Sequence, residues 1–207
     1  PKYENTRHNV GFVIVSKLCK DVKAVKWHET KNYVSWKQND WVFVFPQAYM
    51  NLSGLALQEA IADYDIDMSD ILVVLDDINL PLGKLRIREK GSDGGHKGLR
   101  SIINVFGRND FARLRIGIGP STSDKISLPL DEFVLSPFSK QERDILSNIM
   151  PDIIRLIKAF LKSGYRQMAD EFSKMNSSLS LPMVRTMGRD CDPLREEINN
   201  RKGKYEK

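Results

Sequence analysis

The chain has 207 residues, of which 41% are hydrophobic and 29% are charged, and this composition excludes disorder as the dominant state. No apolar run approaches the roughly 20 residues that a membrane helix requires, so we expect a soluble protein. The formal net charge of +5 suits an anionic partner such as nucleic acid. Cys19 and Cys191 lie far apart without metal-ligand spacing, which favours a reducing compartment.

The first third of the chain predicts two helices that flank short strands. Residues 9–20 carry apolar side chains at helical spacing, so His8 lies just ahead of a helix. Runs rich in valine and aromatic residues predict antiparallel strands at residues 24–28, 33–36 and 41–45. Residues 53–64 predict a second helix, capped by Asn51 or Ser53.

The rest of the chain interleaves strands and helices. Residues 71–75 form an apolar run that ends in Asp76 and Asp77, which is typical of a strand covered on both faces. Further strands are predicted at residues 85–88, 111–118 and 131–135. Further helices are predicted at residues 98–106, 140–162 and 165–175. This order indicates an α/β fold, with a mixed β-sheet flanked by helices in a single domain.

The pattern changes near residue 177, where a polar segment rich in serine and charged residues begins. We therefore expect a domain over residues 1–176 and a C-terminal extension over residues 177–207. The composition of the extension favours a segment that is disordered or docked on a partner.

Three histidines are candidates for chemistry. His28 lies in a strand-like segment, which favours a structural role. His8 precedes a helix, whose positive end disfavours a protonated imidazole and keeps a neutral base available near pH 7. The alternative for His8 is a capping or surface role. His96 lies in a glycine-rich segment.

Carboxylate and amide side chains stand at two other places where chemistry is plausible. Asp76 or Asp77 can hold one nitrogen of an imidazole and leave the other nitrogen free to take a proton from water. The alternative is a pair of solvated turn residues. Asn51 can cap the following helix or donate its amide N–H to a developing oxyanion.

A glycine-rich loop at residues 91–98 precedes a predicted helix, which makes it a candidate phosphate site. It lacks the patterns of nucleoside-triphosphate and dinucleotide sites, and the chain has no serine-esterase elbow. Basic residues alternate along the two strands around this loop: Lys84, Arg86, Arg88, Lys90, Arg113 and Arg115. If these strands are neighbours, their basic side chains form a patch for a nucleic-acid backbone. Two solvated strand faces are the alternative.

Four motifs follow one another along the chain: Thr-Arg-His-Asn-Val-Gly-Phe at 6–12, Tyr-Met-Asn-Leu-Ser-Gly at 49–54, Asp-Asp-Ile-Asn-Leu-Pro-Leu-Gly at 76–83 and Gly-Gly-His-Lys-Gly-Leu at 94–99. In this order they resemble the bacterial-type peptidyl-tRNA hydrolase family over about residues 1–176. The resemblance implies an α/β enzyme without cofactor that hydrolyses the ester between peptide and tRNA. Such an enzyme recycles tRNA released from stalled translation.

By the same resemblance, His8 is the general base that activates water, Asp76 orients it, and Asn51 positions the substrate and stabilises the oxyanion. Roles in binding substrate or tRNA are implied for Tyr3, Tyr49, Asn51, His96, Lys97, Arg88 and Arg115. Arg88 and Arg115 resemble the family's clamp on the acceptor-stem phosphate. We expect a monomer that binds peptidyl-tRNA but no metal or membrane, in the cytoplasm or mitochondria.

Two features depart from the family pattern. The family carries an asparagine where this chain has Lys97. The family also begins with an apolar strand and a Gly-Asn-Pro-Gly turn, whereas this sequence begins at Pro1, so we expect an uncovered sheet edge. A second hypothesis is therefore a non-catalytic RNA-binding relative of the same fold, similar to intron-splicing factors.

Overall fold

The computed structural model describes residues 6–20, 27–47, 49–120 and 128–179. Tyr3, the start of the strand predicted at residues 24–28, and nearly all of the C-terminal extension lie outside these residues. The chain divides into one compact unit over Pro1–Met175 and a second over Asn176–Lys207. The elements described below belong to the first unit, apart from the end of the last helix.

A first sheet contains three antiparallel strands in the order β1-β2-β3. They are β1 (Trp27–Glu29), β2 (Tyr33–Gln38) and β3 (Trp41–Pro46), so the predicted antiparallel arrangement is confirmed. The 3-10 turn η1 (Arg7–Asn9) and helix α1 (Val10–Lys20) precede them. His8 therefore lies in a short turn directly before a helix, as predicted.

A second sheet is mixed and has the strand order β4-β6-β5. Strand β4 (Leu72–Pro81) runs parallel to β6 (Ala112–Gly119), and β5 (Leu85–Arg88) runs antiparallel to β6. Within the described residues β4 pairs with β6 alone. The regular β4–β6 register continues through Asp77 and shifts before Pro81, so β4 extends beyond the predicted apolar run.

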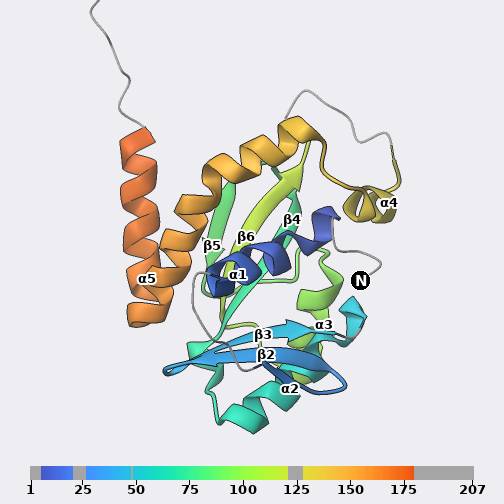
Figure 1. The fold of residues 1–207 in the computed structure, drawn as a ribbon, viewed down its shortest axis with the longest axis vertical. Helices are drawn as coiled ribbons and strands as arrows, with labels where there is room; N and C mark the ends of the chain where they lie inside the picture. The colour runs from blue at the N-terminus through green and yellow to red at the C-terminus, as the bar shows by residue number, and fades with distance from the viewer. Residues whose placement is uncertain (1–5, 21–26, 48, 121–127, 180–207) are drawn as a thin grey trace, which may run out of the picture. The chain divides into compact units, whose positions relative to one another are not determined.

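Helices cover both faces of this second sheet (Figure 1). On one face, α1 lies against β4, and α1, β6 and the first part of α5 (Lys140–Leu179) share a core that includes Ile14, Ile116 and Leu156. On the other face, α3 (Lys97–Phe106) packs on β4 through Leu99 and Leu75. Helix α2 (Ser53–Tyr64) packs beside α3. The α/β class with flanking helices is confirmed.

Helix α5 contains the two helices that were predicted at its place in the sequence. Ser163 and Gly164 have non-helical backbone angles, and Gly164 has a φ of +71°, so the helix breaks between its two predicted parts. Among the described residues, no helix has the length and apolar character needed to cross a membrane.

Two local predictions were wrong. Residues 131–135 form helix α4 (Leu130–Leu135) and not a strand, because Asp131 and Glu132 in its first turn suit the positive end of a helix. Neither Asn51 nor Ser53 caps α2, whose N-cap residue is Leu52. The chain enters α2 through the 3-10 turn η2 (Met50–Leu52), and the Ser53 hydroxyl donates instead to the Met50 carbonyl.

The close packing of α2 on α3 depends on Gly54. Its N–H donates to Ser101 Oγ at 3.0 Å, and a Cβ at this position would collide with the carbonyl of Ser101. Gly54→Ala should therefore destabilise the fold by about 1–3 kcal/mol, despite the higher helix propensity of alanine. Urea unfolding measures this loss, with exposed Gln58→Ala on the same helix as the control. Equal stability of the two variants would contradict the close-approach argument.

Candidate active site

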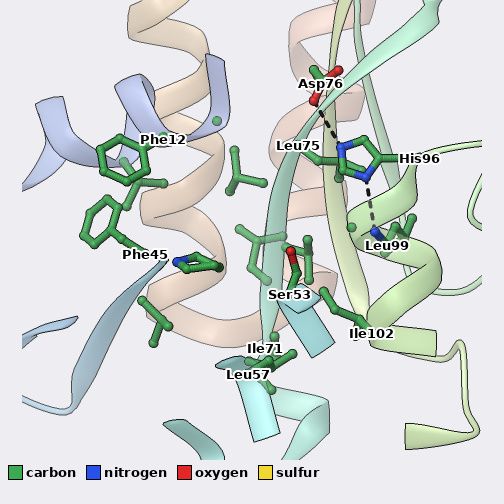
Figure 2. Close-up of a pocket in the computed structure, with 18 of the residues that line it drawn as sticks. Phe12, Phe45, Ser53, Leu57, Ile71, Leu75, Asp76, His96, Leu99 and Ile102 are labelled. Atoms are coloured by element: carbon green, nitrogen blue, oxygen red, sulfur yellow. Dashed lines mark hydrogen bonds and ion pairs between the residues drawn. The ribbon is translucent and has the colours of Figure 1, made fainter. Parts of the chain in front are cut away.

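One buried carboxylate joins two histidines that are distant in sequence. His8 Nδ1 lies 2.7 Å from Asp76 Oδ1, and His96 Nε2 lies 3.1 Å from the same oxygen. Asp76 is only 4% exposed, whereas His8 and His96 are partly exposed. Figure 2 shows the link from Asp76 to His96 and onward to Leu99. A carboxylate at the sheet thus orients two imidazole rings that border a cavity.

The hydrogen bonds determine which ring nitrogen carries each proton. His96 Nδ1 accepts from the Leu99 N–H at 3.1 Å, so its Nε2 carries the proton that is donated to Asp76. His8 donates through Nδ1 to the carboxylate, which leaves its Nε2 unprotonated when the ring is neutral. His8 Nε2 is therefore the nitrogen that can accept a proton from water.

The Asp76 carboxyl group is held in its ionised form. Burial by itself raises the pKa of Asp76, but the hydrogen bonds and charges of His8 and His96 outweigh burial and lower the pKa below its usual value. An ionised Asp76 can accept a hydrogen bond from each of the two rings at once. This is the state that the tautomer assignment requires.

Three different local structures carry the three side chains. His8 comes from turn η1, Asp76 from strand β4, and His96 from the N-cap of α3. The His96 ring caps α3 by accepting a hydrogen bond from the Leu99 N–H, and this bond holds the ring in the orientation in which it contacts Asp76. The structure places His8 beside Asp76 as predicted from sequence. The contact of His96 with Asp76 was not foreseen, although its place before a helix is a signal for a capping residue.

The predicted basic patch is only partly correct. Strands β5 and β6 are neighbours, and their register pairs Arg86 with Arg115 and Arg88 with Arg113. Arg113 is 0% exposed, however, and Arg115 is 7% exposed. The exposed basic side chains at this face are those of Lys84, Arg86, Arg88 and Lys90.

The two buried arginines hold the glycine-rich loop. Arg113 donates to the carbonyls of Gly91 and Ser92. Arg115 donates to Asp77 Oδ2 at 3.1 Å and to the Ser92 carbonyl at 3.0 Å. Burial lowers the pKa of Arg113, and the nearby charge of Arg115 lowers it further. Loop carbonyl oxygens and the Asp77 carboxylate compensate for the buried positive charge of Arg115. In this structure its guanidinium is therefore hydrogen-bonded within the protein and is not exposed for a phosphate.

A cavity begins at the His8–Asp76–His96 cluster and continues between β3 and β4. Figure 2 shows apolar side chains lining it, among them Phe12, Phe45 and Leu57. Tyr49 and Asn51 line the same cavity; Tyr49 is 80% exposed, and Asn51 is exposed as well. The site therefore joins a polar end to an apolar channel.

Lys97 also borders the cavity, and its exposed side chain stands at the first position of α3. A cation is disfavoured at the positive end of a helix, so packing and helix stability give no reason for a lysine here.

The candidate ligand atoms of His8, Asp76 and His96 lie within 4.8 Å of one another, a spacing that a metal ion can bridge. The predicted absence of a metal stays a prediction.

Comparisons with known proteins agree on one family. The model of the peptidyl-tRNA hydrolase family matches residues 1–180. The peptidyl-tRNA hydrolase of Sulfurihydrogenibium is 42% identical over 167 residues, which cover 79% of this chain and 86% of the relative. That of Methylacidiphilum infernorum is 44% identical, with 79% and 87% covered. A crystal structure of Acinetobacter baumannii peptidyl-tRNA hydrolase superposes with a TM-score of 0.72 at 27% identity, over 82% of this chain and 87% of that one.

The tautomer assignment predicts a specific effect of Asp76→Asn. An amide can donate as well as accept, so the His8 ring should lose its strong preference for a proton on Nδ1. Nitrogen NMR of isotope-labelled histidines should show His8 with a protonated Nδ1 in the native protein and a mixture of tautomers in the variant. His28 is the internal control, because the described contacts show no bond between it and Asp76. An unchanged His8 tautomer in the variant would disprove the assignment.

Proposed function

Since the chain belongs to the peptidyl-tRNA hydrolase family, we propose that it hydrolyses the ester bond between peptide and tRNA in peptidyl-tRNA, with His8 as general base. The observation that carries the role of His8 is its bond to Asp76 at 2.7 Å, which leaves Nε2 free for a water molecule. The partly exposed His8 ring borders the cavity, where an ester can approach.

The proposed reaction needs no covalent intermediate with the protein. His8 Nε2 takes a proton from water as the oxygen attacks the ester carbonyl. Asp76 stabilises the imidazolium that forms, as an orienting carboxylate does in other hydrolytic sites. When the C–O bond breaks, His8 returns the proton to the departing ribose oxygen. The peptide acid and the free tRNA are then the products.

Asn51 and Lys97 are proposed to contact the reacting end of the substrate. In the described part of the chain the Asn51 amide makes no hydrogen bond, and it lines the cavity that His8 borders. It is therefore available to donate to the oxyanion of the tetrahedral intermediate. Lys97 supplies a charged donor without an acceptor where the family carries asparagine, so it suits an anionic or carbonyl group of the substrate. Tyr49 offers an exposed ring for the terminal nucleotide.

The exposed arginines of β5 are the proposed phosphate contacts. Arg86 and Arg88 point outward beside the glycine-rich loop, whereas Arg115 is buried against Asp77. We therefore assign the phosphate contact to Arg88 together with Arg86. Arg115 acts on tRNA binding indirectly, by shaping the loop.

The alternative of a non-catalytic RNA-binding relative is not favoured. A protein that only binds RNA has no need of an imidazole whose free nitrogen faces a cavity and whose other nitrogen is held by a carboxylate. The relatives at 42% and 44% identity are both named peptidyl-tRNA hydrolase.

His8→Ala tests the general base. The variant should lower turnover of N-acetyl-aminoacyl-tRNA by about 10³-fold or more, since water is no longer deprotonated, with little change in tRNA affinity. Release of the blocked amino acid measures turnover, and filter binding measures affinity. Substantial turnover by the variant would refute the role of His8. A Lys97→Asn variant assayed in parallel shows whether the lysine supports turnover or reduces it.

Arg88→Ala tests the phosphate contact. Loss of one phosphate contact should weaken tRNA binding and reduce the slope of log affinity against log salt by about 0.7–0.9. Lys158→Ala, which removes an exposed positive charge on α5, is the matched control and should leave the slope unchanged. An unchanged slope for Arg88→Ala would remove this arginine from the tRNA contact.

A further inference from the structure

The residue that directly precedes His8 is a buried arginine with an extensive set of partners. Arg7 is 7% exposed, and its two terminal nitrogens donate to the two carboxylate oxygens of Glu142 at 2.8 Å each. Arg7 Nε donates to Ser136 Oγ at 3.0 Å. The guanidinium carbon also lies over the rings of Phe133 and Phe138, at 4.4 and 4.9 Å from their centroids. This fork is the strongest geometry for an arginine–carboxylate pair.

Glu142 has a second function in the first turn of α5. Its carboxylate accepts from the Ser139 N–H at 2.8 Å, and its own N–H donates to Ser139 Oγ at 3.3 Å. This reciprocal pair is a capping box, with serine at the N-cap and glutamate three residues later. One carboxylate therefore ties the start of α5 to the turn that carries His8.

The turn η1 is short and runs directly into α1, and the Val10 N–H donates to the Arg7 carbonyl. It has three residues, and the Asn9 N–H donates to the Thr6 carbonyl at 3.1 Å. The backbone of this segment is attached from outside, because the Arg7 N–H donates to the Ser136 carbonyl and Thr6 bridges to Pro137. A turn this short is held in place mainly by its tertiary contacts. The orientation of His8 toward Asp76 thus depends on the anchorage of Arg7.

We propose that Arg7 and Glu142 are positioning residues, which hold η1 so that the His8 ring meets both Asp76 and the substrate-side water. Neither side chain is given a role in the chemical step. The inference rests on the proposed function of His8 as general base. A purely structural role of the pair predicts lower stability alone, whereas positioning predicts a loss of turnover in protein that is still folded.

Glu142→Gln is the variant that separates these roles. Glutamine preserves the capping box, since its side-chain oxygen still accepts from Ser139, but it removes the charged fork to Arg7. Turnover of N-acetyl-aminoacyl-tRNA should fall on the order of 10–100-fold in kcat, because a displaced base loses its alignment. The KM should stay within about twofold, since substrate binding is not altered. Nitrogen NMR should show a weakened preference of His8 for the proton on Nδ1.

Glu171→Gln is the matched control, because it removes the charge of another arginine–glutamate pair, with Arg155, further along α5. It should leave kcat, KM and the His8 signal unchanged. If Glu142→Gln unfolds, Arg7→Lys serves as the second variant, since lysine keeps the charge but loses the fork. The same kcat and KM pattern is then expected.

Three results would overturn the positioning role: unchanged kcat in folded Glu142→Gln or Arg7→Lys protein, an equal loss of kcat in Glu171→Gln, or a change confined to KM. The His8→Ala variant separates this proposal from the proposed function. If His8→Ala abolishes turnover and Glu142→Gln does not affect it, only the positioning role fails. If His8→Ala retains turnover, the role of His8 itself fails.

Discussion

The active-site geometry depends on one oxygen atom, Oδ1 of Asp76, which accepts a hydrogen bond from each of two imidazole rings. The carboxylate is buried, so it needs these donors to remain ionised. His8 in turn needs the carboxylate to select its tautomer, whereas the Leu99 N–H selects that of His96. Because His96 is itself held by the backbone of α3, Asp76 is fixed from the helix side and can orient His8 from the strand side. A change in any one member therefore affects the other two.

Buried arginines supply the second constraint around the site. Arg113 and Arg115 on β6 both donate to carbonyls of the glycine-rich loop, Arg115 also donates to Asp77, and Arg7 donates to Glu142. Each cation joins a loop or turn to a rigid element through several hydrogen bonds. Such residues carry positive charge, yet their side chains face the interior. These buried arginines therefore contribute little to the exposed basic surface.

Much of the fold was predictable from local patterns. Helices α1, α2, α3 and α5 and strands β2 to β6 lie where periodicity placed them, because burial of one face imposes a regular spacing on the sequence. Residues 131–135 were wrongly predicted as a strand, because five residues are too few to distinguish the helical period of about 3.6 residues from the strand period of about two. The arginines of β6 were misjudged for a different reason. Alternation shows that Arg113 and Arg115 share a face, but it does not show whether a loop covers that face.

The sequence by itself determined most of the elements, the family resemblance and the candidate residues His8, Asp76 and Asn51, because these follow from local spacing and from motifs. Only the tertiary structure decided that His96 shares the Asp76 carboxylate, that Arg115 is buried, and that Arg7 is anchored to Glu142. These three features join residues 20 to 135 positions apart. Contacts over such separations depend on how helices pack on the sheet. Periodicity shows which face of an element is buried, but it does not show which distant residue that face meets.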